Sequence, residues 1–224
     1  MKKPQGIIFD MDNTVIRSLI DFPLMKSEVC RILSQAGIEP DVTAPVAKIT
    51  ALAKKDALMT DEIWDILWQR IAEIEYEGLT KAVLEPGIVP ILEGLIPHAH
   101  LFMLTNNVYT DAEATIRRLE VRDYFDIMIG RGITPALKPS PDGILYILKK
   151  FSHLKAIDCM AIGDAIIDIQ SAEAAGIEKF IAYNASHDED WNRHSKKPLF
   201  YLKKWDQESL EFLLQTLKRG AFDG

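Results

Sequence analysis

The stretch GIIFDMDNTVI, residues 6–16, decides the fold, because an apolar run leads directly into two carboxylates and a turn. Asp10 and Asp12 are separated by one residue, and Asn13 follows at once. A short apolar run bounded by turn residues is typical of a buried strand in a parallel sheet. The acids at its end predict chemistry only if reactive residues also follow other strands of the chain.

Composition limits the class of protein. The 224 residues are 48% hydrophobic and 26% charged, which is ordinary for a soluble globular protein with one large or two smaller domains. The net charge of −7 excludes a general nucleic-acid binder, although local positive charge could still hold a small anion. We expect free thiols at Cys30 and Cys159, no signal peptide or membrane span, and a cytoplasmic location.

Four more apolar runs resemble the first and are expected to be strands. They are HLFML (100–104), FDIMIG (125–130), DCMAIG (158–163) and KFIAY (179–183). Helical patterns separate them, and this alternation predicts an α/β fold with a doubly wound parallel sheet, a Rossmann-like core. In such sheets, ligands bind at the carboxyl ends of the strands.

Residues 18–85 break the alternation with three successive helical patterns. In the third, Thr60 is the expected N-cap, and an apolar stripe follows at Ile63, Leu67, Ile71 and Ile74. We therefore expect an α/β core from residues 1–17 and 86–224, with an inserted helical cap at 18–85. The polar stretch 184–197 is expected to be a surface loop, and the oligomeric state, monomer or homodimer, is left open.

Reactive residues follow four of the predicted strands. They are Asp10 and Asp12, then Thr105, Asn106 and Asn107, then Lys138, and finally Asp164 and Asp168. One aspartate after a strand is usually a turn or cap residue, but chance does not readily place such residues at four strand ends. Two like charges ~4 Å apart repel by roughly 4 kcal/mol at an effective dielectric near 20. Converging acids therefore predict a cation, and oxygen ligands with open positions suit Mg²⁺.

The motifs FDMDNT, LTNN, LKPSPDG and GDAIID resemble, in order, the four motifs of the haloacid dehalogenase-like phosphohydrolases. The resemblance covers the whole chain, and the first and fourth motifs are the most specific. The inserted segment is similar to the helical cap of the phosphoglycolate phosphatase and β-phosphoglucomutase branch. The resemblance implies that Asp10 is the nucleophile and that Asp12 is the general acid and base.

The resemblance also assigns the ligands. It implies that Mg²⁺ is held by Asp10, the backbone carbonyl of Asp12, and Asp164, with Asp168 supporting the metal or orienting a lysine. It implies that the phosphoryl oxygens are bound by Thr105, the backbone of Asn106, and Lys138. Thr105 and Lys138 also suit phosphate on their own chemistry.

Four residues bear on the turn and on specificity. Asn13 stands where the family often has glycine, and asparagine tolerates the left-handed conformation that such a turn needs. Arg17 either meets a substrate carboxylate or second phosphate, or is a surface or hinge arginine. Trp64 and Trp68 either pack between cap helices or line the substrate pocket.

The expected function is a Mg²⁺-dependent phosphatase acting on a small phosphomonoester, such as phosphoglycolate or a sugar phosphate. Asp12 argues against a dehalogenase, because a halide leaving group needs no proton. A β-phosphoglucomutase-like isomerase is the first alternative, and it requires a cap cation for a second phosphate. A non-catalytic phosphate- or metal-binding protein is the alternative from another class.

Overall fold

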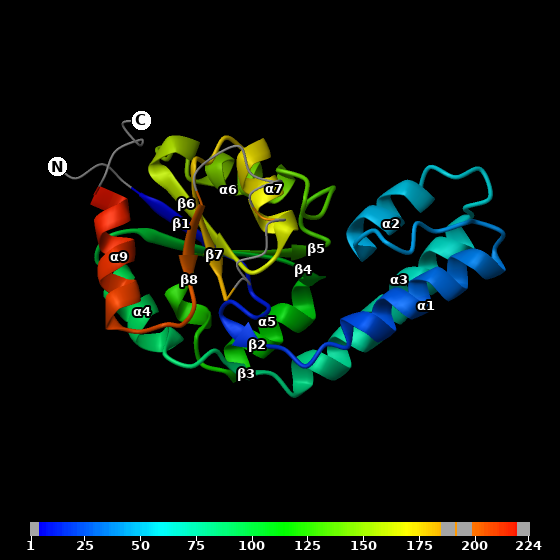
Figure 1. Cartoon of the computed structure of the whole chain (residues 1–224), viewed down its shortest axis with the longest axis horizontal. Coiled ribbons are helices and arrows are strands. Elements are labelled where there is room, and N and C mark those ends of the chain that lie inside the picture. The colour runs from blue at the N-terminus through cyan, green and yellow to red at the C-terminus, as the bar shows by residue number, and fades with distance from the viewer. Residues whose placement is uncertain (1–4, 185–190, 192–198, 219–224) are drawn as a thin grey trace. The chain divides into compact units, whose positions relative to one another are not determined.

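The computed structural model describes residues 5–184, 191 and 199–218. Within these ranges, one parallel sheet has the strand order β5-β4-β1-β6-β7-β8 (Figure 1). Its strands are β1 (Gly6–Phe9), β4 (His100–Val108), β5 (Ile127–Arg131), β6 (Cys159–Gly163), β7 (Lys179–Tyr183) and β8 (Leu199–Leu202). The predicted α/β fold class is confirmed.

Helices cover both faces of this sheet. They are α4 (Ile88–Leu95), α5 (Tyr109–Arg118), α6 (Asp142–Lys150), α7 (Ile166–Ala174) and α9 (Gln207–Lys218), with 3₁₀ turns η1 (Arg122–Tyr124) and η2 (Ala156–Asp158). Helices α6 and α7 lie on one face, and α4, α5 and α9 lie on the other (Figure 1). Every residue of β1, β6 and β7 is buried, which explains why these strands, apart from Lys179 at the start of β7, are apolar in sequence.

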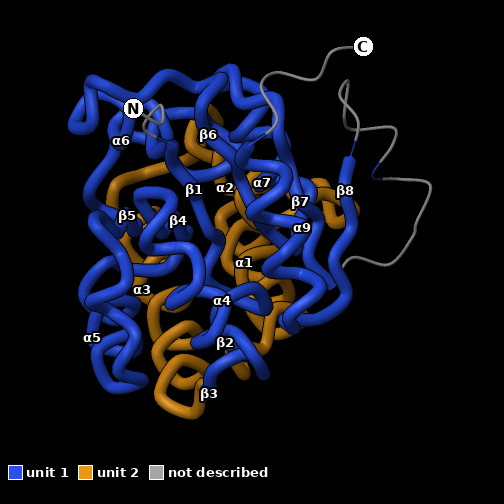
Figure 2. The backbone as a smooth tube through the Cα atoms, turned by 90° about the vertical axis from the view of Figure 1, so that its left-hand side faces the viewer, with its two compact units in different colours: residues 1–17, 83–224 blue, residues 18–82 orange. Residues whose placement is uncertain are grey.

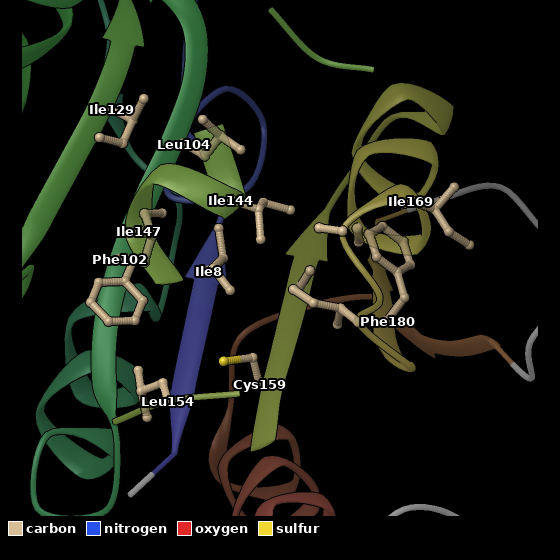
Figure 3. Packing of buried hydrophobic residues seen from close by; sticks show 14 of the residues in the cluster. Ile8, Phe102, Leu104, Ile129, Ile144, Ile147, Leu154, Cys159, Ile169 and Phe180 are labelled. Atoms are coloured by element: carbon tan, nitrogen blue, oxygen red, sulfur yellow. The ribbon is translucent and has the colours of Figure 1, made fainter. Parts of the chain in front are cut away.

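The core on the α6 and α7 face is built from strand residues that point at these helices (Figure 3). Ile8 and Phe102 of the central strands pack with Ile144 and Ile147 of α6, and Ile169 of α7 joins the same cluster. This packing fixes the start of α6 and α7 relative to the strand ends, which is where the reactive residues lie.

The chain divides into two compact units, shown in different colours in Figure 2. Residues 1–17 and 83–224 form what we call the core unit, and residues 18–82 form the helical unit. The helical unit contains α1 (Phe22–Gln35), α2 (Val46–Ala53) and α3 (Asp61–Thr80). As predicted, Thr60 caps α3, because its hydroxyl accepts a hydrogen bond from the Ile63 backbone N–H at 3.2 Å.

A short antiparallel pair lies where the chain passes between the two units. Strand β2 (Ile16–Arg17) pairs with β3 (Val83–Leu84), so the outgoing and returning segments run side by side within the core unit. The sequence did not predict this pair, because two residues are too few to show a periodic pattern.

The observed β4 corrects the predicted strand, which ended at Leu104. The observed strand continues to Val108. The prediction stopped too early because Thr105 and Asn107 are polar, and an apolar run does not reveal polar residues that are nevertheless buried in the strand. Among the described helices, none is both long and apolar enough to span a membrane. The polar stretch 184–197 lies almost entirely outside the described residues.

Candidate active site

Apart from Arg17, the predicted site residues of the core unit meet at the carboxyl edge of the sheet. Asp10 leaves β1 with its backbone N–H donating to the Ile162 carbonyl of β6 at 2.8 Å. Thr105 lies in β4, Lys138 precedes α6, and Asp164 follows β6. The fold therefore brings residues from four separate motifs to one edge.

The Lys138 ammonium lies at the centre of the site and is buried. Its Nζ donates to the Asp10 carboxylate, to Asp168 Oδ1 at 2.6 Å and to the Leu104 carbonyl at 3.1 Å. Burial alone would lower the pKa of Lys138, but the charges of Asp10 and Asp168 raise it above its ordinary value. Lys138 therefore remains charged and has a partner for each of its three donors.

Asp168 is fixed from two further sides. Its Oδ2 accepts a hydrogen bond from the Ala165 backbone N–H at 3.0 Å, in the first turn of α7. A Cβ on Gly163 would lie 2.5 Å from the same oxygen, so only glycine leaves room for this carboxylate. The glycine at the end of β6 thus determines where Asp168 meets Lys138.

Three carboxylates cluster closely enough to share a cation. One oxygen from each of Asp10, Asp164 and Asp168 lies within 4.8 Å of the others. Burial is the largest cause of a raised pKa at Asp10, where Lys138 opposes it and the neighbouring acids add to it. Burial and then Asp168 raise the pKa of Asp164 to about 7. An all-oxygen, crowded and buried donor set fits a hard divalent ion such as Mg²⁺.

The loop after β1 presents Asp12. Asn13 has φ 53°, the left-handed conformation expected for it, and the backbone N–H groups of Val15 and Ile16 both donate to the Met11 carbonyl at 3.0 Å. Asp12 Oδ2 accepts a hydrogen bond from the Asn107 carboxamide at 2.6 Å. The tight turn therefore holds Asp12 near the end of β4.

Asn106 connects β4 to the loop that carries Lys138. Its side chain accepts from the Lys138 backbone N–H at 2.9 Å and donates to the Lys138 carbonyl at 3.0 Å. Arg131 donates to the Asn106 carbonyl at 3.1 Å. The sequence motif indicated only a backbone role for Asn106, whereas the structure adds a two-point side-chain clamp on Lys138.

Arg17 does not join this group of residues. Its Nε and one terminal nitrogen donate to the Glu85 carboxylate at 2.7 and 3.2 Å, and the Tyr183 hydroxyl donates to the same carboxylate at 2.9 Å. The Arg17 side chain is nevertheless 57% exposed. Arg17 thus ties β2 to the residue that follows β3.

Trp64 and Trp68 belong to the helical unit, where they contact each other. Their rings lie edge to face with centroids 5.6 Å apart, and the Lys54 ammonium lies 5.1 Å from the centre of the Trp64 ring. These contacts join the end of α2 to the start of α3.

No role was predicted from the sequence for two residues that the structure places here or close by. Asn107 stands two positions after Thr105, and residues two apart on a strand face the same side, so this signal was present in the sequence. Glu85 gave no signal, because an acid before a Pro-Gly turn is common on protein surfaces, whereas this one is buried.

Comparison of the sequence with known proteins identifies the family of this chain. Residues 4–176 match the haloacid dehalogenase-like hydrolase family. The chain is 28% identical over 194 residues to a phosphoglycolate phosphatase of Rhodobacter capsulatus, covering 81% of this chain and 85% of that protein. It is 25% identical to a fructose-1-phosphate phosphatase of Escherichia coli, covering 77% of this chain and 93% of that protein.

A solved structure shares the fold. A hydrolase from Pseudomonas syringae superposes with a TM-score of 0.68 at 22% identity, covering 96% of this chain and 98% of that chain. With the family match over most of the chain, the family that the four motifs resemble is confirmed. The protein belongs to the haloacid dehalogenase-like hydrolases, as a phosphoric monoester hydrolase.

Proposed function

We propose that the protein is a Mg²⁺-dependent phosphatase for a small phosphomonoester, acting through an aspartyl-phosphate on Asp10. The observation that carries this proposal is the convergence of Asp10, Asp164 and Asp168 around Lys138, with Asp12 two residues from Asp10. The phosphatases named above act on phosphoglycolate and fructose 1-phosphate. We propose substrates of that class, a cytoplasmic setting, and a cap role for the helical unit.

In the first step, a carboxylate oxygen of Asp10 forms a bond to phosphorus while the bond from phosphorus to the ester oxygen breaks. Asp12 gives its proton to that leaving oxygen, so an alcohol departs. In the second step, Asp12 takes a proton from water as the water oxygen attacks phosphorus. The bond from phosphorus to Asp10 then breaks, which restores the Asp10 carboxylate and the protonated Asp12 and releases inorganic phosphate.

Lys138 has a specific role in these two reaction steps. Its three donors already bind Asp10, Asp168 and the Leu104 carbonyl, so binding a phosphoryl oxygen requires one acceptor to be released. When the substrate binds, Lys138 would donate to a phosphoryl oxygen in place of the Asp10 carboxylate. This exchange would free Asp10 to attack phosphorus. Asp168 and Asn106 would keep Lys138 in place during that exchange.

The metal fits the acids that this chain supplies. Asp10 and Asp164, with the Asp12 carbonyl, would hold Mg²⁺, and Asp168 would orient Lys138 and support the metal. When bound, Mg²⁺ offsets the repulsion among the carboxylates and the charge that the phosphoryl oxygens bring. Thr105 and the Asn106 backbone N–H would bind these oxygens beside Lys138.

A hydrolysis screen tests the proposal. The protein is incubated with Mg²⁺ and a panel that includes phosphoglycolate, fructose 1-phosphate and β-glucose 1-phosphate, and both free phosphate and isomerised sugar are measured. We expect Mg²⁺-dependent phosphate release from at least one member. Isomerisation without phosphate release would show that the protein is a mutase and not a phosphatase. If no member of the panel were turned over, a non-catalytic binding protein would be favoured.

Mg²⁺ should also stabilise the folded protein. At a concentration about 100-fold above its Kd, a ligand that binds only the folded state adds about 2.7 kcal/mol to the free energy of unfolding. For a chain of this size, the thermal midpoint should therefore rise by roughly 5–10 °C. Asp164→Asn should lose most of this shift and require more Mg²⁺ for hydrolysis, because one of three clustered acids is neutralised.

The matched control is Asp126→Asn, at the opposite edge of the sheet, where the carboxylate accepts from the Leu101 backbone N–H at 3.2 Å. This variant should keep the full Mg²⁺-induced shift. If Asp164→Asn showed the same Mg²⁺-induced shift of the thermal midpoint and the same metal titration as the parent protein, Asp164 would not be a metal ligand.

A further inference from the structure

A buried carboxamide touches the proposed general acid. Asn107 Nδ2 donates to Asp12 Oδ2 at 2.6 Å. Asn107 is 4% exposed, so its donors cannot be satisfied by bulk water. This bond joins the end of β4 directly to the loop after β1.

The backbone of Asn107 is itself held firmly. Its N–H donates to Thr105 Oγ1 at 3.1 Å, within the extended end of β4. On the neighbouring strand β5, a Cβ on Gly130 would lie 3.0 Å from the Asn107 carbonyl oxygen and 2.7 Å from the Cα of Tyr109. The backbone at Asn107 and Tyr109 therefore packs directly against Gly130, and a larger residue at position 130 would displace it.

We propose that Asn107 is a positioning residue for Asp12, a role that rests on the proposed phosphatase function. The carboxamide N–H occupies Oδ2, so the proton that Asp12 delivers to the leaving oxygen is carried on Oδ1. Once Asp12 has given up this proton, the same hydrogen bond becomes charge-assisted and stronger. Asn107 thus both aims the acid and favours the transfer.

The chemistry of the leaving group separates this role from a purely structural one. An alkoxide is a poor leaving group and needs the proton from Asp12, whereas p-nitrophenolate leaves readily without one. The ratio kcat/KM includes only the steps up to the departure of the leaving group, so the later attack of water does not enter it. A defect in proton delivery therefore lowers kcat/KM for alkyl phosphates selectively.

The test measures kcat/KM in saturating Mg²⁺ for Asn107→Ala and for Asn107→Leu, which keeps the branched shape of the side chain but has no hydrogen-bond donor. The substrates are p-nitrophenyl phosphate and either phosphoglycolate or fructose 1-phosphate, whichever the parent protein turns over faster. We expect a loss of about 10²-fold for the alkyl phosphate, the lower range for general acid catalysis, and a much smaller loss for p-nitrophenyl phosphate. Equal losses for both substrates would overturn the positioning role.

A double-mutant cycle provides a second readout. In the Asp12→Ala background the acid is absent, so Asn107→Ala should cause no further loss with the alkyl phosphate. A further loss as large as that of the single variant would contradict action through Asp12. The control is Thr115→Ala, which removes a buried hydroxyl that donates to the Asp111 carbonyl at 2.8 Å in α5 and should leave the ratio between the substrates unchanged.

The two proposals fail in different ways. If the parent protein hydrolyses no phosphomonoester in Mg²⁺, the proposed function is wrong and the role of Asn107 falls with it. If the parent is active but its selectivity between alkyl and aryl leaving groups is unchanged in both Asn107 variants, only the positioning role is wrong.

Discussion

Replacing Asp10 with asparagine should lower turnover at least about 10⁴-fold, because a carboxamide cannot form the acyl phosphate that the proposed mechanism requires. The fold should survive. Burial raises the pKa of Asp10, which means that the folded protein disfavours its ionised form, so a neutral side chain of the same shape costs little. Lys138 keeps Asp168 and the Leu104 carbonyl as partners.

Two measurements test the expected loss of turnover in Asp10→Asn. Initial rates in Mg²⁺ give the loss of turnover, and mass spectrometry of acid-quenched protein shows whether a phosphoryl group becomes attached. The parent should gain the mass of one phosphoryl group and Asp10→Asn should not. Asp126→Asn, an equivalent substitution at the opposite sheet edge, should retain turnover. Substantial hydrolysis by Asp10→Asn would mean that another group attacks phosphorus.

The second large effect is expected at Lys138. In Lys138→Met, a buried cation between Asp10 and Asp168 is lost and both carboxylates are left crowded without it. Removing one partner from a buried ion pair costs about 3–5 kcal/mol, which for a chain of this size lowers the thermal midpoint by roughly 6–20 °C. Hydrolysis should also be lost, because a ligand for the phosphoryl oxygens is gone.

Lys204→Met is the matched control. Lys204 also pairs with an aspartate, Asp206, at 2.8 Å, but its side chain is 75% exposed. Exposed pairs contribute little because water and salt screen them, so this variant should unfold with the parent and remain active. If Lys138→Met were as stable as Lys204→Met, the buried cation would not be offsetting the repulsion between the acids.

The sheet and the main reactive residues were predictable because parallel strands impose a simple pattern. Buried strands such as β1 and β6 are apolar throughout, and their carboxyl ends must share one edge, so the sequence alone predicted that Asp10 and Asp164 lie together. Helix α3 was predictable from Thr60 and the apolar stripe after it, since both signals follow directly from helix geometry.

The missed features depend on tertiary contacts. The end of β4 is polar in sequence, yet it is buried because Asn107 finds an acceptor on Asp12, a residue far away in the chain. Glu85 is buried because Arg17 and Tyr183 satisfy it, and neither partner can be read from its neighbours in sequence. Local periodicity carries no information about such long-range pairs.

The β2–β3 pair has a consequence for how this protein could be rebuilt. Because Ile16 pairs with Leu84 and Arg17 with Val83, the helical unit is attached through two adjacent strand ends. Folds accept foreign insertions most readily at such sites, since a guest needs only neighbouring termini of its own. The segment 18–82 could therefore be exchanged for the corresponding segment of a related protein, or for a short hairpin turn, without changing the register of the sheet.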